Sequence, residues 1–134
     1  TLAGEKINEE VYEVMIPTID GEISVYPSHQ PLVTVAKPGV VGVRFHKEHP
    51  VDQREYFAIS GGIVEITGDM VQILVDEADH GEDIMVAETQ AALERAIALR
   101  DNASSTVELE KAHQLIDRHA VRLKVSELHR RKRR

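Results

Sequence analysis

The chain has 134 residues, which is enough for one domain with a small appendage and for a core that buries well over half of the unfolded surface. It contains no cysteine, and this excludes a disulfide framework, a thiolate metal site and a cysteine nucleophile. Its formal net charge of −7 is unevenly distributed, because half of the 16 Lys and Arg residues fall within residues 118–134, where Glu127 is the single acid. An acidic body with a basic end predicts an anionic partner for that end, either within the molecule or outside it.

Short β-forming segments separated by Gly, Pro and Asp follow one another up to about Asp79. The first covers residues 11–16 and is expected to end at Pro17, because proline lacks the N–H that a sheet ladder uses. Further strands are expected at 23–26, 32–35, 40–45, 55–59, 63–66 and 70–75. All eight glycines and all five prolines lie in this half of the chain, where tight turns need them. This spacing predicts an antiparallel sandwich or barrel.

From Val86 onward the apolar residues recur with a helical period. Residues 101–105 interrupt this pattern, and Ser105 with Glu108 three residues later has the sequence of a capping box, so a second helix is expected to begin near Thr106. The short connection predicts an antiparallel helical hairpin. We therefore expect two domains, a β-sandwich over residues 1–82 and a helical hairpin over residues 83–134. The expected apolar face of the second helix comprises Leu109, Ala112, Leu115, Ile116, Ala120 and Leu123.

Seven histidines raise the question of a metal site, above all in the segment 46–49. Adjacent residues in a polar loop cannot converge on one ion without ligands from elsewhere, and the strands lack the inward-facing histidines of a metal-dependent barrel enzyme. The segment Ser60-Gly61-Gly62 lacks the Gly-Lys-Ser/Thr of a phosphate loop and favours a turn between two strands. We therefore expect no catalytic residue and no metal, with a metal-dependent barrel enzyme as a weaker alternative.

The basic segment 130–134 has three open interpretations. It suits a solvated helix end, because cations are favoured at the negative end of the helix dipole. It also suits a nucleic-acid tail, as in a stand-alone binding protein, although the body is acidic and the chain offers only two Phe, three Tyr and no Trp for stacking on bases. The third interpretation is docking onto an acidic protein surface. Charge alone does not separate these interpretations.

Several motifs, read in order, resemble the epsilon subunit of F-type ATP synthases, which is called delta in mitochondria. The most specific is Gly-Glu-Ile-Ser-Val-Tyr-Pro-Ser-His-Gln-Pro-Leu at residues 21–32, followed by the Ser-Gly-Gly at 60–62. The resemblance extends from one end of the chain to the other through the supporting segments 2–5, 37–40, 63–66, 73–78 and 122–125.

The resemblance implies an all-β sandwich of about ten strands followed by a C-terminal antiparallel two-helix hairpin. It implies a non-catalytic rotor subunit of the central stalk that links the gamma subunit to the c-ring of a proton-translocating ATP synthase. By position, Glu22 resembles a residue facing the c-ring and His29 one facing gamma, with Ser60, Gly61 and Gly62 also at the subunit interface. The expected location is the cytoplasmic face of a bacterial inner membrane, reached only through the c-ring, with an organellar matrix side as the alternative.

The resemblance also implies an inhibitory switch in the hairpin. In the extended state the second helix would run beside gamma, and its basic residues would meet an acidic loop of the catalytic beta subunit in the ring of alpha and beta subunits, which blocks ATP hydrolysis. The residues expected to act there are Arg118, Arg122, Lys124, Arg130, Arg131, Lys132, Arg133 and Arg134.

Two departures from the family pattern change these expectations. Many bacterial members bind ATP through a first-helix motif, Ile/Leu-Asp-x-x-Arg-Ala, whose acid and arginine are here Met85 and Glu88. Arg118 and Arg122 still align with nucleotide-contacting arginines, but half a site predicts weak or absent ATP binding and no cofactor. Family members also carry one more strand before the segment matching residues 2–4, so we expect the sequence to be incomplete at that end.

Overall fold

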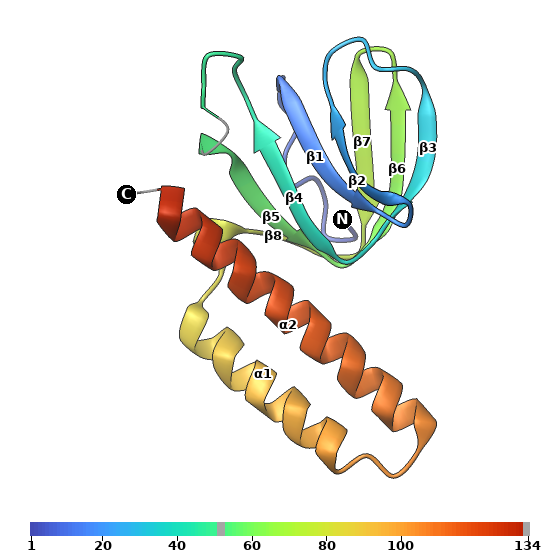
Figure 1. Ribbon diagram of the computed structural model, residues 1–134, viewed down its shortest axis with the longest axis vertical. Helices are drawn as coiled ribbons and strands as arrows, with labels where there is room; N and C mark the ends of the chain where they lie inside the picture. The colour runs from blue at the N-terminus through green and yellow to red at the C-terminus, as the bar shows by residue number, and fades with distance from the viewer. Residues whose placement is uncertain (51–52, 133–134) are drawn as a thin grey trace.

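The computed structural model describes residues 1–50 and 53–132, and Figure 1 shows a β-sheet domain with a long helical hairpin attached. The strands are β1 (Glu13–Thr18), β2 (Gly21–Val25), β3 (Leu32–Ala36), β4 (Gly39–Arg44), β5 (Glu55–Ile59), β6 (Gly62–Thr67), β7 (Met70–Val75) and β8 (Ala78–His80). A short 3₁₀ helix, η2 (Gly81–Asp83), leads into the helices α1 (Val86–Asp101) and α2 (Thr106–Lys132).

The strands form one antiparallel, eight-stranded sheet in the order β7-β6-β3-β1-β4-β5-β8, with β2 paired to β1 outside this path. The sheet folds over itself, so that its two ends face each other across a common core (Figure 1). The sandwich predicted from the sequence is confirmed, with eight strands in the described residues where the resemblance implied about ten.

Strand β1 does not end at Pro17, as expected, but continues to Thr18. Along one edge, β1 pairs with β4 from Glu13 to Met15, and pairing with β3 begins only at Thr18. Pro17 therefore lies at the gap between two neighbouring strands, where its carbonyl accepts a bond from the Lys37 N–H at 2.9 Å and no donor is needed from the proline itself.

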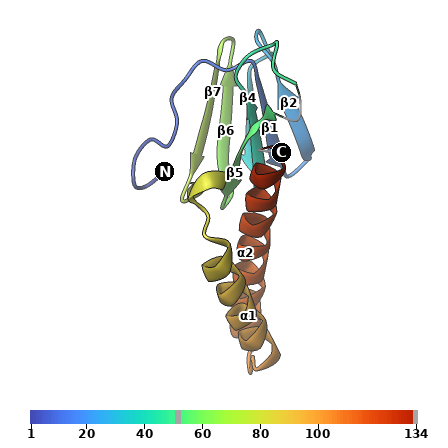
Figure 2. The same cartoon turned by 90° about the vertical axis from the view of Figure 1, so that its left-hand side faces the viewer.

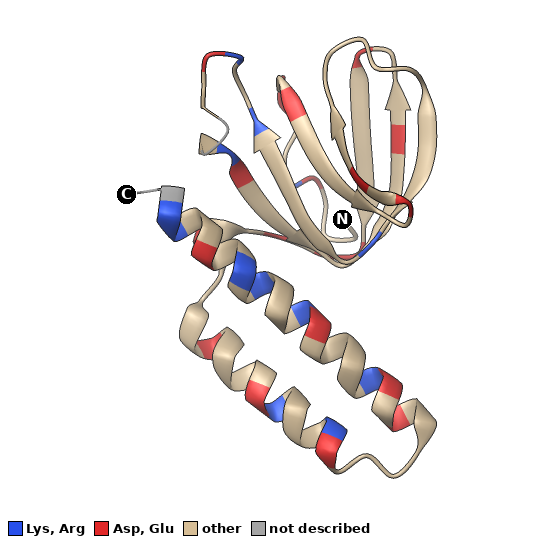
Figure 3. Cartoon of the chain, viewed as in Figure 1, with Lys and Arg blue, Asp and Glu red and all other residues tan. Residues whose placement is uncertain are grey.

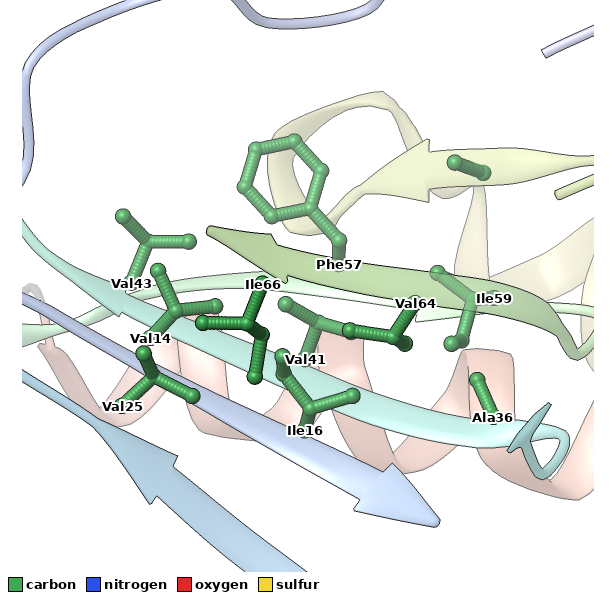
Figure 4. Packing of buried hydrophobic residues seen from close by; sticks show 11 residues of the cluster. Val14, Ile16, Val25, Ala36, Val41, Val43, Phe57, Ile59, Val64 and Ile66 are labelled. Carbon is green, nitrogen blue, oxygen red and sulfur yellow. The ribbon is translucent and has the colours of Figure 1, made fainter. Parts of the chain in front are cut away.

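The core is formed by the inward side chains of both halves of the folded sheet, as Figure 4 shows. Ile16 and Val64 are fully buried and Ile66 is 2% exposed. The remaining members are Val14, Val25, Ala36, Val41, Val43, Phe57, Ile59 and Ala78. Each large aliphatic side chain buried here stabilises the fold by roughly 1.5–3 kcal/mol before ordering costs, so this cluster holds the sandwich together without the helices.

The hairpin predicted from the helical periodicity is confirmed, together with the start of its second helix. α1 has 16 residues and closes with the Asn102 amide donating to the Ala98 carbonyl at 2.8 Å. The Glu108 N–H donates to the Ser105 hydroxyl at 3.2 Å, whereas the Glu108 carboxylate accepts from the N–H and hydroxyl of Ser104, both at 2.9 Å. The hydrogen bond from the Ser104 N–H, followed by that from its hydroxyl, lowers the pKa of Glu108. The Glu108 carboxylate therefore binds Ser104, whereas in the usual capping box it would bind the backbone N–H of the N-cap residue, here Ser105.

α2 is longer than α1, and its C-terminal part packs on β4, β5 and η2 (Figures 1 and 2). We call the surface on which α2 packs the seat. There Val125 is fully buried and forms a cluster with Ala58 and Ile84. Val125 was absent from the predicted apolar face, because it points to the sheet and not to α1, whereas Ala120, which was included, is exposed. No helix within residues 1–50 and 53–132 is long and apolar enough to cross a membrane.

Candidate docking surfaces

Glu22 lies at the start of β2, just after the tight turn that joins β1 to β2. The Thr18 hydroxyl stabilises this turn by donating to the Gly21 carbonyl at 2.6 Å and accepting from the Asp20 N–H at 3.2 Å. Gly21 has a φ of 115°, a backbone conformation that favours glycine. The Glu22 side chain is exposed beside this hydrogen-bonded turn, as a docking residue needs to be.

His29 lies in the loop at the other end of β2, so the structure does not bring it next to Glu22. Its Nδ1 is 2.7 Å from the Gln30 carbonyl oxygen, and it must therefore donate, which leaves Nε2 as an acceptor in the neutral ring. The preceding Ser28 has a φ of 65°, which is uncommon for a residue with a side chain. A loop held in this conformation presents the half-buried imidazole in one orientation.

Ser60, Gly61 and Gly62 form the turn between β5 and β6, as the sequence indicated. Ser60 binds the Glu77 backbone twice, since its N–H donates to the Glu77 carbonyl at 3.1 Å and its hydroxyl accepts from the Glu77 N–H at 3.0 Å. Gly61 and Gly62 have φ angles of 94° and 157°, and a Cβ on either would crowd neighbouring backbone. Contacts within the sheet domain account for these three residues, and their assignment to a subunit interface remains a prediction.

An apolar stripe crosses the outer face of the sheet where no helix covers it. Val35, Ile63 and Leu74 are direct cross-strand neighbours on β3, β6 and β7, and each is about half exposed. Val33 and Ile19 extend the stripe with exposures of 68% and 60%. We call these five residues the outer stripe; the sequence showed only strand alternation here, and the register was needed to place them side by side.

Lys and Arg residues occur at several places along α2 (Figure 3), and those from Arg118 onward differ in their partners. Arg118 forms an ion pair with Glu77, and the Arg122 Nε lies 3.3 Å from the Asp79 carboxylate, so both arginines bind the sheet domain. Lys124 and Arg130 are exposed, and Arg131 pairs with Glu127 of the same helix at 2.8 Å. The side chain of Lys132 and the whole of Arg133 and Arg134 lie outside the described residues.

His119 lies between the two helices beside Arg95. Burial, together with the charges of Arg122, Arg118 and Arg95, lowers the pKa of His119 below its usual value. The ring is therefore neutral at physiological pH, and the positive charge of this face comes from the arginines.

The two first-helix positions of the nucleotide motif, Met85 and Glu88, carry no basic side chain. Met85 is the N-cap of α1 and makes no side-chain capping bond, and its side chain is 61% exposed. Glu88 in the first turn is exposed and anionic. Arg118 and Arg122, the other half of the motif, are engaged by carboxylates.

His46 and His49 stack edge to face with ring centroids 4.8 Å apart in the β4–β5 loop. Across residues 1–50 and 53–132, no three His, Asp or Glu side chains are grouped so that they could hold a metal ion.

A buried charge cluster at β1 was not recognised from the sequence. Glu13 is 1% exposed and accepts from Arg54 Nη2 at 2.7 Å and Nε at 3.2 Å, with the Arg44 Nε at 3.5 Å. Burial by itself would raise the pKa of Glu13, but hydrogen bonds from Tyr26 and Arg54 and the charges of both arginines outweigh it and lower the pKa. The signal was an acid inside a β-forming segment, but its partners lie at the end of β4, just after β2 and just before β5.

The chain is similar to known proteins over almost its whole length. Residues 1–81 match the family model described as ATP synthase, Delta/Epsilon chain, beta-sandwich domain. The chain is 35% identical over 120 residues to the ATP synthase epsilon chain of Staphylococcus aureus strain JH9, which covers 90% of this chain and 86% of the relative. The epsilon chain of the Newman strain matches equally well.

Two solved structures share the fold. A chain in the cryo-EM structure of the Euglena gracilis mitochondrial ATP synthase, OSCP/F1/c-ring in rotational state 1, aligns with a TM-score of 0.74 and 23% identity, over 92% of this chain and 73% of that one. A chain of the Tetrahymena thermophila mitochondrial ATP synthase central stalk and c-ring aligns with a TM-score of 0.54 and 15% identity, over 89% and 84%. With the family model and the curated relatives, the conclusion is that this chain belongs to the ATP synthase delta/epsilon family.

Proposed function

We propose that the chain is the non-catalytic epsilon-type subunit of the central stalk of a proton-translocating F-type ATP synthase, where it links gamma to the c-ring. The observation that carries this proposal is the 35% identity to epsilon chains over 120 residues, which includes both the sandwich and the hairpin. The chain reaches the membrane only through the c-ring, on the cytoplasmic face of a bacterial inner membrane.

The outer stripe is the surface that suits gamma. Exposed apolar side chains that form a contiguous patch are typical of protein interfaces. Four residues of the stripe lie on β3, β6 and β7 and Ile19 lies in the β1–β2 turn, whereas α2 packs on β4 and β5, so the docked hairpin leaves the stripe accessible. His29, with its Nε2 available as an acceptor, is assigned to the same partner, and Glu22 on the opposite tip of β2 is assigned to the c-ring.

A pull-down from detergent-solubilised membranes tests this assignment. We expect the tagged chain to retain gamma, beta, alpha and c subunits, and the double variant Val35→Asp/Ile63→Asp to lose gamma. A control variant, Lys47→Asp, makes the net charge more negative by the same amount in the β4–β5 loop, away from the stripe, and keeps gamma. Recovery of salt-sensitive nucleic acid without any rotor subunit would instead support a stand-alone binding protein with a nucleic-acid tail.

We also propose that the hairpin inhibits ATP hydrolysis when α2 leaves the sheet. Deleting residues 107–134 is expected to raise hydrolysis by the assembled complex severalfold and to leave assembly intact, because the core of the sandwich contains no helix residue. ATPase activity and subunit composition of the same preparation provide the measurement. Lys111→Ala, which removes an exposed base outside the basic end, serves as the control. Unchanged hydrolysis after the deletion would refute the inhibitory role.

Regulatory binding of ATP is proposed to be weak or absent. Arg118 and Arg122 are already paired with carboxylates, and the exposed Glu88 repels phosphate. Isothermal titration calorimetry is expected to give no measurable heat with micromolar ATP. A variant carrying Met85→Asp and Glu88→Arg, which restores the acid and the arginine of the first-helix motif, is expected to bind more tightly. Micromolar affinity in the unaltered chain would contradict the proposal.

A further inference from the structure

The two ion pairs between α2 and the sheet domain match in spacing. Arg118 and Arg122 are four residues apart on the helix, a rise of about 6 Å on one face. Their partners Glu77 and Asp79 are two residues apart on extended chain, which spans about 6.7 Å on one face. The residue numbers increase together, with Arg118 on Glu77 and Arg122 on Asp79, so helix and strand run in the same direction here.

Contacts within the sheet domain hold the backbone that carries both carboxylates. Ser60 binds the Glu77 backbone through the N–H and the carbonyl, so the residue that leads into β8 cannot shift along the edge. Asp79 lies opposite Ala58 in the β5–β8 register, and Ala58 is buried beneath Val125 of α2. The carboxylates therefore stand at the rim of the surface on which the helix is seated.

The apolar part of this seat is small. Its buried members are Ala58, Ile84 and Val125, with Val40, Tyr56 and Val121 partly buried around them. α2 comes so close to Gly81 that a Cβ on this residue would lie 2.7 Å from the His129 Cβ. Because the seat has few large side chains, we expect the charge pairs at its rim to add measurably to what holds the helix.

We propose that Glu77 and Asp79 form a charge latch, which holds α2 on the sheet by occupying the two arginines that an acidic partner surface would otherwise bind. This inference rests on the proposed function for the identity of that partner. The latch makes docking and release a competition between two sets of carboxylates for the same guanidinium groups. Arg118 and Glu77 are 42% and 49% exposed, so an acidic peptide surface and salt both reach the pair.

Distance measurements on the isolated full chain test the latch. The chain has no cysteine, so Thr67→Cys on β6 and Gln114→Cys on α2, both exposed, give two unique sites for spin labels. We expect the latch variant Glu77→Gln/Asp79→Asn to increase the ratio of released to docked helix about tenfold at low salt, which corresponds to about 1.4 kcal/mol. The control variant Glu65→Gln/Asp69→Asn removes the same charge from β6 and the β6–β7 turn and is expected to match the unaltered chain.

Two further measurements make the test specific. Raising the salt concentration to about 1 M should release the unaltered chain and leave the latch variant almost unchanged, since ion pairs are screened. Exchanging the partners, as Glu77→Arg with Arg118→Glu, should restore docking that either single change weakens. Equal released fractions in the latch variant, the control and the unaltered chain would overturn the inference, as would a released fraction of the control variant that equals that of the latch variant.

The latch and the proposed inhibitory function are tested by separate measurements. The distance measurement needs no other subunit, so it decides the latch whether or not the chain inhibits hydrolysis. In the assembled complex, the latch variant is expected to inhibit hydrolysis more strongly, because its arginines are released. A variant that opens in solution but leaves hydrolysis unchanged would refute the inhibitory role and leave the latch established.

Discussion

Replacing Gly62 with alanine is expected to lower the free energy of unfolding by about 3–5 kcal/mol, the largest effect of any single change considered for this chain. Gly62 has a φ of 157°, and an added Cβ would lie 2.9 Å from both the Leu74 carbonyl carbon and the Val75 Cγ1, with the Leu74 oxygen closer still. These atoms belong to β7, which pairs directly with β6 at this residue. Either β6 or β7 must therefore move, and the pairing between these two strands is weakened at Gly62.

Gly68→Ala provides a matched control. Gly68 lies in the turn at the other end of β6, a Cβ there would meet nothing within 4 Å, and its backbone does not require glycine. Urea unfolding followed by circular dichroism should show a large decrease in midpoint for Gly62→Ala and a small change for Gly68→Ala. Equal midpoints would show that β6 and β7 adjust without cost, and the Ser60-Gly61-Gly62 motif would then need an explanation outside the fold.

Replacing Glu13 with glutamine is expected to lower the free energy of unfolding by about 3 kcal/mol at neutral pH, because it leaves two largely buried guanidinium groups without their anion. Arg44 and Arg54 are each 13% exposed, and Glu13 is their shared carboxylate. Adding Arg54→Gln should recover part of the loss, because the double variant no longer buries the Arg54 guanidinium without its anion. Glu10→Gln, an exposed acid three residues earlier, is the control.

The same carboxylate makes stability depend on pH. Glu13 has its pKa lowered in the folded chain from the ordinary value of 4.5, so the unfolded chain binds its proton first as the pH falls. The stabilisation is fully present above pH 4.5 and decreases below it, until the pH has passed the folded pKa. Unfolding free energies measured between pH 7 and pH 3 should therefore fall less steeply in Glu13→Gln than in the unaltered chain, and parallel curves would contradict this assignment.

Local patterns in the sequence determined the class of fold. Alternating apolar residues between glycines and prolines predict strands whatever the rest of the chain does, and seven of the eight strands were located in this way. The Ser105 and Glu108 pair predicts the start of α2 for the same reason, because a helix cap forms within a few residues. The family resemblance along residues 21–32 is also a property of the sequence itself.

Contacts between distant residues decided the rest. The three-residue β8 has no pattern of its own and exists because it pairs with Phe57, Ala58 and Ile59 of β5. Pro17 is accommodated inside β1 because two different strands share its edge. Neither feature is visible in a window of neighbouring residues.

The partners of the charged residues were likewise decided by the tertiary structure and not by the sequence. The sequence predicted an anionic partner for the basic end, but the partners of Arg118 and Arg122 are Glu77 and Asp79, about 40 residues earlier in the chain. Glu13 reads as an ordinary strand residue until β4 and the segment before β5 bring two arginines to it. Electrostatic partners are chosen by proximity in space, which depends on the register and packing of the whole sheet, and composition contains no information about either.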